Sequence, residues 1–163
     1  MKRSSTILSL IALAAVAPAP VLAGAGVQEH VVVSPDMVPW KPAPPALPKG
    51  AEFAVLSGDP SQEGQAFVMR VKFPANYRVP AHWHSTSETV TVLSGTFNIG
   101  MGDQLNRAGA QALEAGGFVL MPAKTHHFAW VDTETVIQVN ATGPWTLNYV
   151  NPADDPRQAP ATQ

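Results

Sequence analysis

The chain has 163 residues, enough for one ordinary domain, and a formal net charge of −2. This slightly acidic balance, without a basic cluster, argues against nucleic acid or an anionic membrane surface as a partner. Cysteine is absent, which excludes disulfides and thiolate metal ligands, so the stability of the protein has to come from packing.

The first 23 residues have the pattern of an export signal. Lys2 and Arg3 form a short positive region, residues 7–16 are apolar apart from one serine, and residues 21–23 suit a signal peptidase. The alternative is a membrane anchor, but a span needs about 20 apolar residues and this stretch is shorter. We expect residues 1–23 to be a signal peptide and the protein to be periplasmic or secreted.

Residues 24–50 form a Pro-rich N-terminal arm. Val31, Val32 and Val33 are a candidate short edge strand. The Pro-rich run over residues 39–48 can be neither helix nor central strand, because proline lacks the N–H and fixes φ. Two interpretations remain open: an arm that lies on the domain surface, with Trp40 as its anchor, or an unattached linker.

Residues 51–150 alternate short β-rich segments with turn residues, and no stretch has a convincing helical period. The predicted strands are Phe53–Leu56, Gln65–Phe73, Glu88–Leu93, Phe97–Met101, Phe118–Met121, Phe128–Val131, Thr135–Asn140 and Trp145–Val150. We interpret Ser94-Gly95 as a hairpin turn, and residues 104–115 as a weak helix candidate. Residues 151–163 are expected to be a frayed or surface-laid C-terminal tail.

The segment from Pro80 to Gly95 contains the most informative residues. Successive side chains of a strand alternate between its faces, so His82 and His84 project the same way. Two imidazoles with the carboxylate of Glu88 supply most of a coordination shell for a transition metal, and a histidine from another strand would complete it.

This pattern resembles the cupin superfamily. In the first cupin motif, two histidines and a glutamate bind metal and a glycine closes a turn, and the corresponding residues here are His82, His84, Glu88 and Gly95. The second motif matches at Gly116, Pro122 and His127.

Three positions depart from the cupin pattern. Asn76 and Lys124 stand where cupins have glycine, and Val131 stands where they have asparagine. Asparagine tolerates a left-handed turn better than most residues. The departures therefore concern loop geometry rather than the ligands.

The resemblance implies an all-β protein in which residues 51–150 form a single-domain cupin-type jelly-roll β-barrel. It also implies a metal site made of His82, His84, Glu88 and His127. Nitrogen donors with one carboxylate suit a divalent transition metal (Mn, Fe, Co, Ni, Cu or Zn) rather than Ca or Mg. His126 competes with His127 for the fourth position, and the spacing from Pro122 favours His127.

The inner walls can be predicted only in part. If Glu88 faces inward, Val90 and Val92 do so as well and give the metal an apolar floor. On a later strand, either Gln138 and Asn140 or their neighbours, at positions 137 and 139, face the cavity, and both remain open. Aromatic candidates for the cavity rim are Tyr77, Phe128, Trp130 and Tyr149.

Three functions are compatible with these observations. The first is a metal-dependent enzyme of oxygenase, lyase or isomerase type acting on a small-molecule substrate, with its catalytic residues unassigned. The second is a non-catalytic metal- or ligand-binding cupin comparable to sensor-like members. The third is a metal that only supports the fold. Because cupins often dimerise, the arm over residues 30–50 is a candidate for crossing to a second copy in a homodimer.

Overall fold

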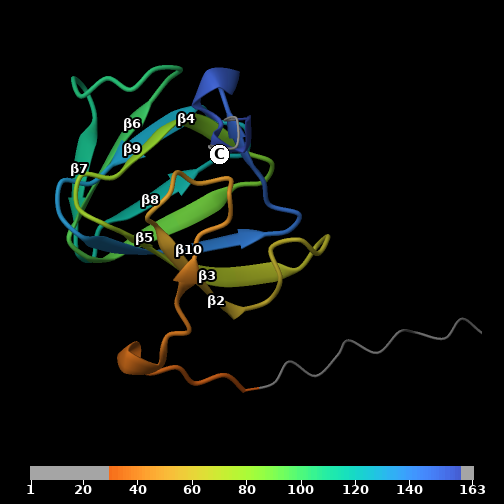
Figure 1. The fold of residues 1–163 in the computed structure, drawn as a ribbon. Helices are drawn as coiled ribbons and strands as arrows, with labels where there is room; N and C mark the ends of the chain where they lie inside the picture. The colour runs from red at the N-terminus through yellow and green to blue at the C-terminus, as the bar shows by residue number, and fades with distance from the viewer. Residues whose placement is uncertain (1–29, 159–163) are drawn as a thin grey trace, which may run out of the picture. The chain divides into compact units, whose positions relative to one another are not determined.

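Two antiparallel sheets make up the domain in the computed structural model, which describes residues 30–158 (Figure 1). The predicted signal peptide lies outside these residues. The six-stranded sheet has the order β1 (Lys41–Pro42), β2 (Glu52–Ser57), β3 (Ala66–Phe73), β10 (Thr135–Thr142), β5 (Glu88–Ser94) and β8 (Phe118–Met121). The five-stranded sheet has the order β11 (Leu147–Tyr149), β4 (Arg78–His84), β9 (His127–Trp130), β6 (Thr96–Met101) and β7 (Gln111–Glu114).

Within the described residues, the helical elements are three short 3-10 turns: η1 (Pro35–Met37), η2 (Pro152–Asp154) and η3 (Pro156–Gln158). Between residues 30 and 158, no helix has the length and apolar character needed to cross a membrane.

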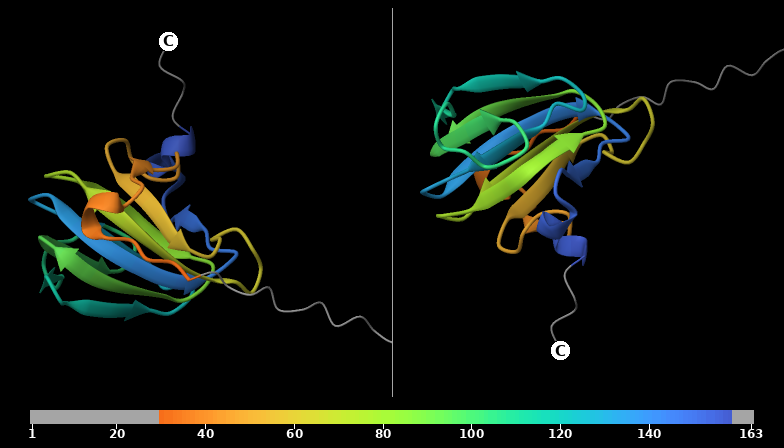
Figure 2. Two further views of the ribbon diagram at one scale, coloured as in Figure 1. Left: turned by 90° about the horizontal axis from the view of Figure 1, so that it is seen from below. Right: turned by 90° about the horizontal axis from the view of Figure 1, so that it is seen from above.

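The strands form a two-layered sandwich rather than the closed barrel that we expected. The strand pairings of the described residues stay within each sheet, so β1 and β8 are the edges of one sheet and β7 and β11 those of the other. The two layers face each other in Figure 2. Alternation along a strand predicts which side chains face inward but not whether the outermost strands pair, so sequence could not decide between sandwich and barrel.

Alternating side chains of both sheets form the core between the layers. On β3 every second residue, from Phe67 to Phe73, is buried, and on β5 Val90 and Val92 are buried as predicted. A second, smaller cluster contains Ala81, Phe128 and Trp130. The cavity described below is surrounded by side chains of the main core, between the two sheets.

Three local predictions are wrong. Ser94-Gly95 is not a hairpin turn, because the chain passes there from β5 in one sheet to β6 in the other. Gly95 has a φ of 77°, and a Cβ at this position would collide with the backbone of Glu134 and Thr135. The helix candidate over residues 104–115 instead contains β7, and residues 31–33 form no strand.

The Pro-rich arm lies on the domain. The Trp40 ring packs under the ammonium of Lys72, with 4.8 Å between Nζ and the ring centroid, and β1 then pairs with β2 as the outermost strand of the sheet. Residues 43–51 form a loop, here called the strap, whose ends are joined by the hydrogen bond from the Ala43 N–H to the Ala51 carbonyl (2.9 Å). The surface-laid interpretation is therefore the one that the described part of the arm follows.

Candidate metal centre

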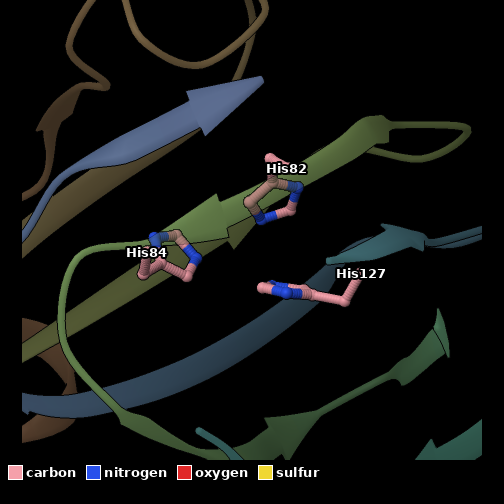
Figure 3. A group of neighbouring side chains, drawn as sticks. All are labelled: His82, His84 and His127. Atoms are coloured by element: carbon pink, nitrogen blue, oxygen red, sulfur yellow. The ribbon is translucent and has the colours of Figure 1, made fainter. Parts of the chain in front are cut away.

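Three histidines from two neighbouring strands converge between the sheets. His82 and His84 lie on β4 and His127 on β9, where His82 and His127 are directly opposite each other in the ladder. One ligand nitrogen from each ring lies within 4.8 Å of the others, and all three residues are buried. Figure 3 shows the three rings turned toward a common point.

A β-bulge in β4 sets this geometry. The register between β4 and β9 shifts between Val79 and His82, so Val79 and His82 both face inward although two residues separate them. Without the extra residue, alternation from Val79 would have turned His82 and His84 outward.

Backbone carbonyls fix the orientation of every ring. The Nδ1 atoms of His82, His84 and His127 lie 2.7, 2.9 and 2.9 Å from the carbonyls of Pro80, Thr146 and Thr125, respectively. A carbonyl can only accept, so each Nδ1 carries the proton and each Nε2 keeps its lone pair. A metal-binding histidine typically has such a partner for its second nitrogen.

Glu88 brings the carboxylate from the opposite sheet. It is the first residue of β5, and its Oε1 lies 3.4 Å from the Nε2 of His84 and 3.7 Å from the Nε2 of His127. Ligand atoms around an ion with bonds near 2.1 Å are about 3 to 3.5 Å apart. The Glu88 carboxylate thus lies beside two of the three converging histidines, at separations close to those between ligands of one ion.

Burial gives the histidines the protonation state that a cation needs, but it opposes the ionisation of Glu88. Burial lowers the pKa of His84 to about 3, with a further contribution from His127, and burial also lowers the pKa of His82 and of His127. The imidazoles are therefore neutral at neutral pH. Burial raises the pKa of Glu88 to about 8, which the side chain of Trp145 opposes.

A cation at this point removes the cost of ionising Glu88, because opposite charge favours the carboxylate. Three neutral imidazoles and one carboxylate without thiolates fit a divalent transition metal and do not fit Ca or Mg. The donor set thus agrees with the ion that the motifs imply.

Trp145 is a site residue that sequence reasoning missed. Its ring stacks on that of His84, with centroids 4.2 Å apart and planes at 15°. Its buried indole N–H makes no close hydrogen bond, although the side chain of Trp145 lowers the pKa of Glu88. We interpret the N–H as directed toward the Glu88 carboxylate in a long contact. Trp145 lies 57 residues beyond Glu88 in sequence, with no local motif to reveal its position.

His126 has a different environment from His127. Its side chain is 41% exposed, and its Nδ1 lies 2.6 Å from the Oδ1 of Asp103. Because adjacent strand residues face opposite sides, the chain brings His127 to the other two histidines and directs His126 outward.

The two turn positions at which the sequence departs from the cupin pattern adopt left-handed backbone conformations. Asn76 has a φ of 62° and Lys124 a φ of 61°. They are the two non-glycine residues with positive φ in the described part of the chain, so the turns are kept although glycine is replaced. The Lys124 N–H also donates to the carbonyl of His84 (2.9 Å), which joins this loop to the metal-site strand.

A cavity of about 360 Å³ opens from the four residues into the space between the sheets. Its other walls are almost entirely apolar, with side chains from β2, β3, β5, β6 and β10 and from the strap. Ile137 and Val139 line it, so Gln138 and Asn140 face away, which settles the alternative that the sequence left open.

None of the four aromatic rim candidates lines this cavity. Phe128 and Trp130 belong to the second cluster. Tyr77 and Tyr149 instead hold the strap, because their hydroxyls donate to the carbonyls of Pro48 and Ala46.

Comparison with known proteins gives a family and a fold. The sequence model of a family described as the ChrR cupin-like domain matches residues 28–146. No curated protein matches the chain.

Several solved structures are similar in fold. The polyketide cyclase RemF from Streptomyces resistomycificus has a TM-score of 0.65 and 16% identity, over 78% of this chain and 90% of that one. A putative acetylacetone dioxygenase from Methylibium petroleiphilum has a TM-score of 0.60 and 23% identity, over 78% and 85%. An acetylacetone dioxygenase from Acinetobacter johnsonii has a TM-score of 0.60 and 18% identity, over 78% and 81%.

Proposed function

Because this chain belongs to the ChrR cupin-like domain family of the cupin superfamily, we propose that it binds a divalent transition metal and acts as a metal-dependent enzyme on a small molecule. We propose His82, His84, Glu88 and His127 as the ligands. The signal-like residues 1–23 support export, so the proposed place of action is the periplasm or the exterior of the cell.

One observation carries this proposal. The Nδ1 atoms of all three histidines are engaged by backbone carbonyls, so three Nε2 lone pairs face one point beside a buried carboxylate. Without a cation, the three Nε2 lone pairs would be buried without a charge to bind. The Glu88 carboxylate would likewise have no positive charge to offset the cost of its burial. A structural role for the metal is less well supported, because the site borders a cavity instead of being closed.

The proposed ligands, the backbone carbonyls behind them and the cavity walls have different roles. A divalent ion held by them supplies a Lewis acid that can polarise a substrate oxygen. The carbonyls of Pro80, Thr146 and Thr125 keep the imidazoles neutral and correctly turned. Glu88 supplies the one negative charge, and the apolar walls exclude water from the space above it.

The cavity offers no separate acid or base. Among the described residues that line it, Arg157 is the one titratable group besides the four proposed ligands. Lyase and isomerase reactions need a group that moves a proton at the substrate. We therefore place oxygenase chemistry first, and the dioxygenases named above agree with this order without establishing it.

The same observation favours a second candidate, a non-catalytic metal- or ligand-binding cupin that acts as a sensor. The two candidates share the metal site and differ in whether bound molecules are converted.

The first experiment is elemental analysis of the protein purified from its native source, together with the variants His84→Ala, His127→Ala and His126→Ala. We expect about one ion per chain in the native protein and in His126→Ala, and a loss of stoichiometric metal in the other two variants. Full metal retention in His84→Ala would remove this residue from the ligand set.

The second experiment separates the two candidates. The metal-loaded protein is incubated with a small-molecule panel with and without dioxygen, and oxygen consumption and product formation are followed. Turnover that needs dioxygen supports the oxygenase. Saturable binding of panel members without any turnover supports the sensor.

A further inference from the structure

The walls of the cavity define which kind of molecule the site takes. Resting on the proposed function, we propose that the ligand is a neutral, largely apolar small molecule that carries its metal-binding oxygen atoms at one end. The other end then lies between the sheets, under the strap.

The polar groups of the cavity, apart from Arg157, are gathered at one side. The histidines and Glu88 lie there, next to Trp145 and Thr146, while the rest of the surface is provided by aliphatic, Met, Phe and Pro side chains, among them Met69, Met121 and Phe97. A hydroxyl, amide or ammonium placed there would lose its hydrogen bonds to water without gaining new ones. Sugars, polyols and amino acids, which carry polar groups along their whole length, are thereby disfavoured.

Trp145 and Thr146, the polar residues next to His84, belong to the metal-binding end of the cavity. Thr146 accepts the His84 ring N–H with its carbonyl, and its hydroxyl accepts from the Asn148 amide (2.7 Å). Trp145 is stacked on His84, and its indole nitrogen is buried. Neither residue therefore supplies a free group for the distant end of a ligand.

Arg157, on η3, is the cation that an anionic ligand would need, but it is occupied. Its Nε and Nη2 atoms donate to the two carboxylate oxygens of Asp155 at 2.8 and 2.9 Å, and Nη2 also donates to the Leu147 carbonyl (3.1 Å). The bidentate pair compensates the charge of the guanidinium, so we assign Arg157 to the cavity wall and not to an anion receptor.

The strap adds apolar cover on the side of the C-terminal turns. Pro44, Ala46 and Leu47 line the cavity, and Tyr77 and Tyr149 hold the strap in place through its carbonyls. Figure 2 shows the orange segment with the strap beside the blue C-terminal segment. The cover is therefore fixed to the domain and not loosely apposed.

The volume limits the size of the ligand. A cavity of about 360 Å³ corresponds to about twelve water molecules at roughly 30 Å³ each. A chain of about six carbons with a bidentate oxygen head fits this space.

The test uses three hydroxamates with the same metal-binding head. They are acetohydroxamate, hexanohydroxamate and the monohydroxamate of adipic acid, which matches hexanohydroxamate in chain length but ends in a carboxylate. Dissociation constants are measured by calorimetry on the full Zn²⁺-loaded protein. We expect affinity to rise about fourfold for each added methylene, and the carboxylate-ended probe to bind at least tenfold more weakly than hexanohydroxamate.

Three variants locate the effect. Val139→Phe should fill part of the cavity and abolish the gain from the longer chain while leaving acetohydroxamate binding intact. Gln138→Phe, on the opposite face of β10, should change nothing. If the adipic probe binds most tightly and loses that affinity in Arg157→Gln, the ligand is an anion and the inference is overturned.

A fluorescent probe without a metal-binding head separates this inference from the proposed function. N-phenyl-1-naphthylamine is added to the metal-free protein, and its displacement by 2-octanone is followed in the native protein and in Val139→Phe. Bound probe, displaced by the ketone and excluded by Val139→Phe, supports the apolar cavity even if no hydroxamate binds, in which case the metal proposal fails. Absence of probe binding, with equal affinities for all hydroxamates, refutes the cavity inference and leaves the metal proposal standing.

Discussion

Glu88→Gln should stabilise the metal-free protein and destabilise the metal-loaded protein. The carboxyl has an ordinary pKa of 4.5, and burial raises its pKa to about 8 in the folded chain. A raised pKa contributes stability that is complete below pH 4.5 and is lost as the pH rises toward 8. The metal-free fold is therefore penalised at pH 7, where Glu88 is protonated when folded but ionised when unfolded.

The size of the penalty follows from the pKa. Each pH unit between 4.5 and 7 costs about 1.4 kcal/mol, so the loss at pH 7 is about 3 kcal/mol. Glutamine keeps the shape and never ionises, but its buried amide lacks a full set of partners and costs about 1 to 2 kcal/mol. The net gain of about 1 to 2 kcal/mol should raise Tm by about 5 °C.

The assay is thermal unfolding of both proteins at pH 5 and pH 7, once with a chelator and once with saturating Zn²⁺. Without metal, the variant should unfold at the higher temperature at pH 7, and the advantage should shrink at pH 5. With Zn²⁺ the order should reverse, because each tenfold loss of metal affinity removes about 1.4 kcal/mol of stabilisation. Glu63→Gln, on an exposed carboxyl, is the matched control.

A Glu88→Gln protein that is less stable than the native one at pH 7 in chelator would contradict this reasoning. Equal stabilisation of the two proteins by Zn²⁺ would show that the carboxylate is not a ligand.

Three further predictions concern the same region. Metal uptake at pH 7 should release about one proton, because Glu88 is protonated and the lowered pKa values leave the histidines neutral. Calorimetry in buffers of different ionisation enthalpy measures the number of protons released. A metal affinity that does not change between pH 5 and pH 7 would contradict this prediction. Trp145→Phe should keep the stacking on His84 but remove the indole N–H, and so lower metal affinity about tenfold. A competition assay with a chelating dye measures the metal affinity. An unchanged affinity would assign Trp145 to packing alone. Gly100→Ala should destabilise the fold by about 1 to 3 kcal/mol, since its Cβ would collide with the ring of Phe128; denaturant unfolding measures the loss, and an unchanged midpoint would show that the ring can move aside.

Local alternation and motif spacing predicted which histidines converge, and predicted the architecture only in part. His82, His84 and Glu88 lie within seven residues, and the shared face of the two histidines follows from the strand period. Even there the bulge before His82 was not foreseen, although it decides which face the histidines occupy. His127 was chosen over His126 from motif spacing, and the structure brings His127 to the other histidines.

The errors have a common physical origin in long-range pairing. The hairpin at Ser94-Gly95 was inferred from two adjacent strands joined by a glycine, but β5 pairs with β8 and β10 and not with β6. Within the helix candidate, Gln111–Glu114 form the edge strand β7 because β6 offers them a partner. Trp145 was missed because its place beside His84 depends on β11 pairing with β4, which no local pattern encodes.

The passage from β4 to β5 has a mechanical consequence. His84 ends a strand of one layer and Glu88 begins a strand of the other, with only three residues between them. A bound ion would link the two sheets, and a change in the distance between the sheets would stretch the bonds from the ion to His84 and Glu88. Any motion that separates the two sheets would therefore also weaken metal binding.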